Sequence, residues 1–259
     1  KVIEELKYIE VDKLSGCSIG SIIALLYFVD INNYDKFNKQ FYTLACKQLK
    51  KKHNLNIFEK LFKMLKKVLP HDIIKQINNK LYISYFNIKT KKHIVKSYYK
   101  NFNDLFDTIR RSCSVPLVID NNMFYNKKYI DGLHPHIFPK TKNKRIIYLN
   151  ITNSNYIYNM YSVKQEPTNI RRILEGIYDT HTFFNTKYST NMCSYVDEWS
   201  ILFNLKHILM KLLFKILVYI LHWFYNLNNI IDKRNCNKNI TIGSITNTIY
   251  ILFLNTFCI

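Results

Sequence analysis

The sequence predicts an α/β domain followed by a long apolar helix. Three observations support this fold class. Residues 9–28 have the pattern of a short strand, a sharp turn and a buried helix, residues 80–99 alternate in the way that sheet strands do, and residues 201–227 are almost all apolar. A chain of 259 residues is long enough for one domain with a substantial core and an appendage.

The first elements surround a glycine-flanked serine. Lys1–Ile9 predicts an amphipathic helix, Val11–Leu14 a short strand, and Ser21–Phe28 a buried helix. Between the last two lies Gly-Cys-Ser-Ile-Gly, residues 16–20. A serine on a strand-to-helix turn has its hydroxyl at a helix N-terminus, and we expect the two glycines to let the backbone pass without Cβ clashes.

The following segments alternate between helix and strand. Residues 36–69 predict basic helical structure that Pro70 ends, with an apolar and a lysine-rich side in its last part. Residues 80–99 predict a hairpin, or two sheet strands, with a polar turn at 89–92. A short helix with Asn103 as its N-cap follows, and then a strand end at Tyr129 and Ile130 leads into a turn at Asp131-Gly132.

The five-residue motif is specific. With five glycines and thirteen serines in the chain, chance produces Gly-x-Ser-x-Gly about 0.005 times. Ser18 is therefore a candidate nucleophile. The alternative is that Ser18 only caps a helix in an ordinary strand-to-helix turn, which needs at most one of the glycines.

The amino-acid composition indicates which kinds of partner the protein can bind. The net charge is +20, but only six of the 38 basic residues are arginine, and lysine, asparagine, isoleucine and tyrosine are abundant. This usage is typical of an AT-rich genome, such as that of a protist or a giant DNA virus. We expect attraction to anionic membrane surfaces, no specific recognition of nucleic acid and no obligate protein partner.

The six cysteines are widely spaced and form no Cys-x-x-Cys pair or metal-ligand grouping with histidine. They indicate a reduced, intracellular protein without a metal or other cofactor. No signal peptide is visible in the sequence.

The order of four segments resembles the patatin-like phospholipase family. These segments are Gly-Cys-Ser-Ile-Gly at 16–20, the strand Leu-Tyr-Ile-Ser-Tyr-Phe-Asn-Ile-Lys-Thr at 81–90, Ile-Arg-Arg-Ser-Cys-Ser-Val-Pro at 109–116 and Tyr-Ile-Asp-Gly at 129–132. The resemblance implies a three-layer α/β/α domain with a mostly parallel central sheet. It also implies a lipid acyl hydrolase with a Ser-Asp dyad, in which Ser18 is the nucleophile and Asp131 the general base.

The resemblance further assigns the elbow and turn residues Gly16, Cys17, Ile19, Gly20, Gly132 and Leu133. Leu133 stands where the family has glycine or alanine, and we expect it to crowd the loop beside the base. The family also has a glycine-rich oxyanion loop upstream of its first helix, which these 259 residues do not include. We therefore expect the chain as given to be N-terminally truncated and weak or inactive, because one oxyanion donor contributes about 3 kcal/mol.

Two other interpretations use the same residues. A Ser-Asp-His triad requires His134, His136 or His181 as the base. A catalytically degenerate relative would bind membranes without hydrolysis. Cys17 and Cys113 border the expected site and are interpreted as small buried residues.

The apolar segment 201–227 carries a polar stripe on one helical face: Asn204, His207, Lys211, Lys215, His222 and Asn226. This pattern, with aromatic residues near one end, predicts a helix in a membrane interface. A transmembrane span at about 208–227 and a core helix are the alternatives.

These segments together predict four regions. Residues 1–155 form the catalytic domain, 156–200 its helical continuation, 201–227 the membrane-associated helix, and 228–259 a linker with an apolar tail.

Overall fold

The computed structural model describes residues 9–29, 37, 39–41, 43, 57–115, 123–150 and 170–234. These residues group into two compact units that divide between Ile137 and Phe138. The predicted helix at residues 1–8, most of the region 30–56, Pro116 and the tail from residue 235 lie outside the described residues.

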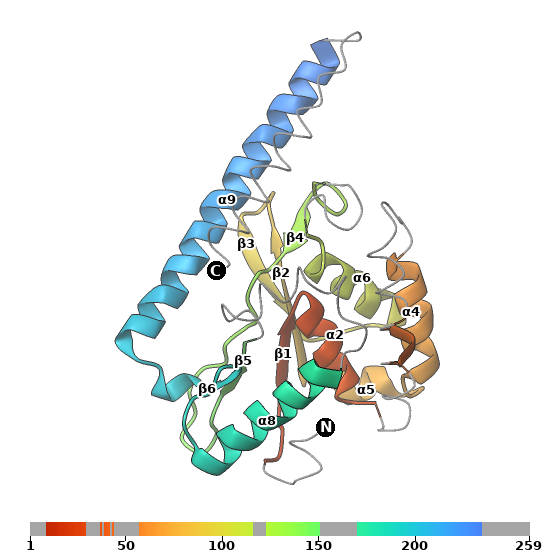
Figure 1. Ribbon diagram of the computed structural model, residues 1–259. Helices are drawn as coiled ribbons and strands as arrows, with labels where there is room; N and C mark the ends of the chain where they lie inside the picture. Colours follow the sequence, from red (N-terminus) through yellow and green to blue (C-terminus); the bar gives the residue numbers. More distant parts are fainter. Residues whose placement is uncertain are drawn as a thin grey trace. The chain divides into compact units, whose positions relative to one another are not determined.

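The first unit contains a four-stranded sheet built around β2 (Leu81–Asn87) (Figure 1). β1 (Leu14–Cys17) pairs with β2 in parallel, whereas β3 (Lys92–Lys96) and β4 (Tyr129–Asp131) pair with it antiparallel. The predicted α/β fold and the hairpin of residues 80–99 are confirmed.

Both faces of β2 are covered. Leu81, Ile83 and Tyr85 point to one side and Ser84 and Phe86 to the other, and all five are at most 4% exposed. A strand that is buried on both faces belongs to the interior of a sheet. β2 is therefore the central strand of this sheet, and the other three strands all pair with it.

Two helices pack directly on this sheet. α2 (Ile19–Leu26) follows β1 after one residue and packs on β1 and β2, and α6 (Phe102–Ser112) packs on β2 and β4. α2 and α6 also contact each other. Their buried residues, such as Leu25 and Ile109, belong to the main hydrophobic core.

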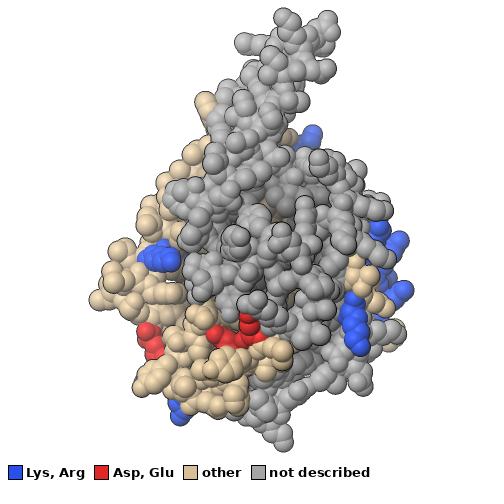
Figure 2. Space-filling view, viewed as in Figure 1, with Lys and Arg blue, Asp and Glu red and all other residues tan. Residues whose placement is uncertain are grey.

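Helices α4 (Ile57–Val68) and α5 (Ile73–Ile77) complete this core. The apolar side of α4 is inside, with Leu65 fully buried, and its lysines are exposed, as the sequence predicts. Figure 2 shows basic side chains gathered over α4.

Several predicted boundaries shift by a few residues. The first strand is Leu14–Cys17 instead of Val11–Leu14, so it contains the first glycine of the serine motif. The predicted N-cap Asn103 is wrong: Asn101 is the cap, because its extended backbone lets its side chain accept a hydrogen bond from the Asp104 N–H at 3.0 Å.

The second unit holds a two-stranded antiparallel sheet of β5 (Ile147–Leu149) and β6 (Cys193–Tyr195), with helix α8 (Ile170–Thr186). Asp179 of α8 accepts hydrogen bonds from the Thr190 hydroxyl and from the Asn191 and Met192 N–H groups. Asp179 is only 7% exposed because it binds this loop.

A short 3-10 turn, η2 (Val196–Glu198), leads into α9 (Ile201–Arg234). Two residues of this turn, Asp197 and Glu198, pair with Arg145, whose guanidinium lies 3.4 Å from the centre of the Tyr195 ring. Among the described residues, none of the helices combines the length and the apolar character that crossing a bilayer requires.

The contact between β1 and α2 gives a testable difference between two glycines. A Cβ on Gly16 would lie 2.5 Å from the Gly20 carbonyl oxygen and 2.6 Å from the Ser21 Cα, whereas a Cβ on Gly20 meets nothing within 4 Å. We expect Gly16→Ala to lower the free energy of unfolding by about 1–3 kcal/mol. Gly20→Ala should leave it unchanged or raise it by up to about 1 kcal/mol.

Chemical denaturation of the two variants measures this difference. Equal destabilisation of both would contradict the close approach of β1 to α2.

Candidate active site

The ends of two strands meet on one edge of β2. β3 occupies one edge of β2 along residues 83–87, so β1 and β4 share the other edge. On that edge β1 ends with Cys17 opposite Ser84, and β4, which runs the other way, ends with Asp131 opposite Tyr85. Because Ser84 and Tyr85 are consecutive, the register places residues 17 and 131 next to each other.

Ser18 forms the turn between β1 and α2. Its backbone has φ 54° and ψ −136°, a conformation that L-residues adopt rarely and that costs about 1–3 kcal/mol. Its carbonyl oxygen accepts hydrogen bonds from the Ser21 N–H at 2.9 Å and the Ser21 hydroxyl at 2.6 Å. The sharp strand-to-helix turn expected from the motif is therefore present.

The two glycines of the motif have different roles. Gly16 is needed because its Cα lies against the backbone of α2. The expectation of a Cβ clash at Gly20 is wrong, since Gly20 faces open space. Ile19, the first residue of α2, is 38% exposed.

A serine that the sequence interpretation missed supports the turn. The Ser112 hydroxyl, at the end of α6, accepts a hydrogen bond from the Ser18 N–H at 2.9 Å and donates one to the Ser84 carbonyl at 2.8 Å. Ser112 is fully buried. Its segment was part of the family resemblance, but a serine in such a segment gives no sign of which N–H it will bind.

Asp131 is a buried carboxylate, 7% exposed. Its Oδ1 accepts a hydrogen bond from the Leu133 N–H at 2.8 Å and one from the Cys17 thiol at 3.3 Å. Burial raises the pKa of Asp131 above its ordinary value, and the neighbouring Ser18 side chain, the Leu133 N–H and the Cys17 thiol oppose the increase.

Gly132 and Leu133 shape the turn after Asp131. A Cβ on Gly132 would lie 3.0 Å from the Ser84 carbonyl oxygen and 3.1 Å from the Cys17 sulfur. Leu133 has φ 64°, and its side chain is 40% exposed. Leu133 therefore affects the site through its left-handed backbone, which favours glycine, and its outward side chain does not support the expected crowding.

Cys17 and Cys113 are both buried thiols, as expected. Burial and the nearby Asp131 raise the pKa of each above its ordinary value, so both stay protonated at neutral pH. The hydrogen bond from Cys17 to Asp131 was not predicted, since sequence spacing does not reveal it.

A profile of the patatin-like phospholipase family matches residues 1–133, which include both Ser18 and Asp131. The chain belongs to the patatin-like phospholipase family. This family comprises lipid acyl hydrolases. No curated protein and no solved structure matches the chain.

The three histidines of the triad interpretation have other neighbours in the structure. The His134 ring stacks on His93 of β3, with centroids 4.6 Å apart, and its carbonyl oxygen accepts a hydrogen bond from the Ser84 hydroxyl. The His136 ring stacks on Tyr82. His181 lies in α8 of the second unit, where it pairs with Asn185.

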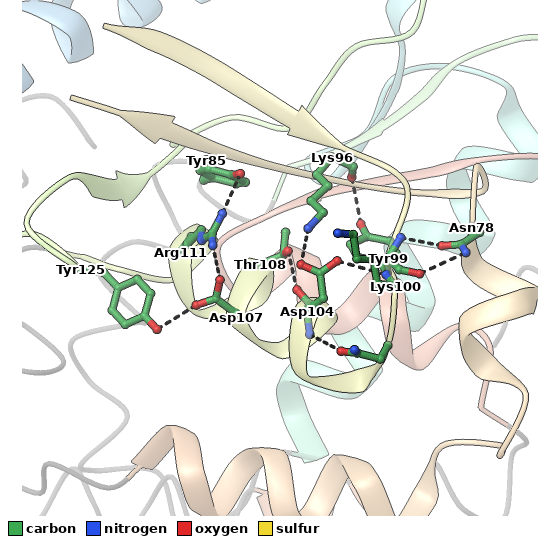
Figure 3. Close-up of polar contacts among 11 residues, drawn as sticks. Asn78, Tyr85, Lys96, Tyr99, Lys100, Asp104, Asp107, Thr108, Arg111 and Tyr125 are labelled. Atoms are coloured by element: carbon green, nitrogen blue, oxygen red, sulfur yellow. Dashed lines mark hydrogen bonds and ion pairs between the residues drawn. The ribbon is translucent and has the colours of Figure 1, made fainter. Parts of the chain in front are cut away.

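A polar network fixes α6, and with it Ser112, to the sheet (Figure 3). Arg111 pairs with Asp107 one turn earlier, donates to the Tyr85 hydroxyl at 3.2 Å and lies 4.3 Å from the centre of the Tyr129 ring. At the other end of α6, Lys96 of β3 pairs with Asp104. α6 is therefore held at both ends.

The described residues contain no cluster of three or more His, Cys, Asp or Glu side chains that could hold a metal ion.

Ser112→Ala tests the support of the turn. The substitution leaves the Ser18 N–H without its buried acceptor, and we expect the free energy of unfolding to fall by about 1–3 kcal/mol. Ser114→Ala is the matched control, because Ser114 contacts Asp131 through its backbone carbonyl, which the substitution keeps. Urea denaturation of both variants should show a loss for Ser112→Ala alone. A loss of similar size in both would contradict this role.

Proposed function

We propose that the protein hydrolyses lipid acyl esters through a covalent acyl-Ser18 intermediate, with Asp131 as the general base. One observation carries the proposal: β1 and β4 end next to each other on β2, so the Ser18 turn that begins α2 lies beside the buried Asp131 carboxylate, and the Ser18 side chain helps to keep the pKa of that carboxylate down. Membership of the patatin-like phospholipase family supports the class of reaction.

The first half-reaction acylates Ser18. The Ser18 oxygen attacks the ester carbonyl carbon while Asp131 takes the hydroxyl proton, and a tetrahedral oxyanion forms. The carbon–oxygen bond to the leaving alcohol then breaks, and Asp131 returns the proton to that alcohol. The N–H groups of Ile19 and Gly20 precede the Ser21 N–H, which binds the Ser18 carbonyl, and they lie at the positive dipole end of α2, so they suit the oxyanion.

The second half-reaction uses water. Asp131 takes a proton from a water molecule, which attacks the acyl carbon, and the bond to Ser18 breaks. The proton returns to the Ser18 oxygen, and a fatty acid is released. A carboxylate at its ordinary pKa is a weak base, so the burial that raises the pKa of Asp131 favours this role.

The dyad can be tested with the hydrolysis of a chromogenic fatty acyl ester, which we expect to be weak but measurable. We expect Ser18→Ala to remove hydrolysis and Asp131→Asn to lower kcat/KM by about 10²–10⁴, the range for a general base. The alternative proposal, a relative that binds membranes without hydrolysis, predicts no turnover that depends on Ser18 in the folded protein.

Asp131→Asn also carries its own folding control. The raised pKa means that ionising Asp131 costs stability, and this cost grows as the pH rises from about 4 through the folded-state pKa. The Asn variant removes the cost. It should therefore be at least as stable as the wild type at pH 7, and clear destabilisation would contradict the assigned environment of Asp131.

Cys17 provides a test based on pH. The Cys17 thiol stabilises the Asp131 carboxylate by donating to it, so Cys17→Ala should raise the pKa of Asp131 further. We expect the acid limb of the kcat/KM profile to move to higher pH in Cys17→Ala. Cys17→Ser, which keeps a donor, should stay closer to the wild type. A structural role alone would lower the whole profile without moving its acid limb.

A further inference from the structure

Helix α9 has two apolar faces. With 100° between successive residues, Phe214, Leu217, Val218 and Leu221 lie together on one side and are at most 7% exposed. Six other residues lie within a sector of about 80° on the opposite side and are 41–59% exposed: Leu205, Leu209, Leu212, Ile216, Ile220 and Trp223. We call these six the exposed face of α9.

The predicted polar stripe separates the two faces. Asn204, Lys215 and Asn226 of the stripe are exposed, whereas His207, Lys211 and His222 are partly covered. Burial lowers the pKa of His207 to about 4, so His207 is neutral at pH 7. The stripe is thus the border between a covered and an uncovered apolar surface, and it does not form a separate solvent side.

We propose that the exposed face of α9 binds the interface of an anionic lipid bilayer, with the helix axis parallel to the membrane. From Leu205 to Trp223 the face extends over about 27 Å, and aliphatic side chains dominate it. Where Figure 2 shows side chains of this helix in colour, on the left of the view, most of them are uncharged. A helix with a long aliphatic face and lysines beside it is typical of binding in the membrane interface.

The charged residues along α9 favour an anionic membrane over a second copy of the chain as the partner of the exposed face. No acidic residue occurs between Glu198 and Asp232, while Lys206, Lys211 and Lys215 lie along the same segment. A second copy of the chain on this face would bring these lysines together without carboxylates to pair with them. Anionic lipid head groups supply the missing negative charge, and long lysine stems can lie along the apolar face while their ammonium groups reach the head groups.

Two aromatic residues of α9 also favour a membrane interface as the partner of this face. Trp223 is 58% exposed and Tyr219 is 41% exposed, both toward one end of the face. Amphipathic rings of tryptophan and tyrosine concentrate at the level of the lipid head groups.

Trp223 makes the proposal measurable. Only Trp199 and Trp223 occur in the chain, so Trp199→Phe leaves one indole, on the exposed face. Vesicles of phosphatidylcholine with one quarter phosphatidylserine should shift the emission of Trp223 to shorter wavelength. Pure phosphatidylcholine should give a weaker effect, with apparent affinity falling about fivefold for each lysine that contacts the surface.

A double variant tests the face itself. Leu212→Ser with Ile216→Ser should lower the vesicle partition coefficient at least tenfold, because burial of aliphatic side chains drives insertion. Leu174→Ser with Ile177→Ser in α8 is the matched control, since these residues are also exposed, at 59% and 40%. Flotation of the unsubstituted protein gives the same information without relying on Trp199→Phe.

Binding does not require turnover, so this test is independent of the proposed hydrolysis. Loss of vesicle binding in the α9 variant alone would support the proposal. Binding that is absent, equal in both double variants, or indifferent to phosphatidylserine would overturn it. A dimer in solution that the α9 variant dissociates would also overturn it, because a second copy would then cover the face.

Discussion

The pairing of two strand ends on one edge of β2 is the constraint on which the candidate site depends. β1 reaches Ser84 from one direction and β4 reaches Tyr85 from the other, so residues separated by more than a hundred positions in sequence become neighbours. A shift of one residue in either register would turn the side chains of that strand to the other face of the sheet. The burial of β2 on both faces opposes such a shift, since each of its positions is fitted to a packed neighbour.

This arrangement concentrates unfavourable conformations at one place. Ser18 and Leu133 both have positive φ, and the Asp131 carboxylate, two residues before Leu133, is buried. Each feature costs free energy, which the core formed by α2, α4, α5, α6 and β2 must offset. Strained backbone and a buried charge at the same site are typical of functional sites, where stability is lost in exchange for reactive geometry.

The sequence was sufficient for the parts of the fold that depend on local patterns. The alternation in residues 80–99, the amphipathic pattern of α4 and the rare serine motif all have short-range causes, and each appears where it was expected. The link between Ser18 and Asp131 came from the family resemblance, because no local pattern connects two residues this far apart.

The features that the sequence could not predict depend on three-dimensional packing. The role of Ser112 depends on the packing of α6 against β2. The sequence alone does not distinguish Gly16 from Gly20, because only the path of the backbone shows which of them lies against another segment. The partners of the buried Asp179 come from a loop beyond α8, which no local pattern indicates. The sequence does not distinguish the covered from the exposed apolar face of α9. Periodicity identifies the apolar residues, but it does not show whether another part of the protein covers them.

The central claim is that Ser18 is an activated nucleophile that depends on Asp131. Reaction of the folded protein with a fluorophosphonate, followed by digestion and mass spectrometry to locate the adduct, tests it most directly. The account predicts an adduct on Ser18 that forms at least tenfold more slowly in Asp131→Asn. An adduct on another residue, no adduct at all, or a rate that Asp131→Asn leaves unchanged would contradict it.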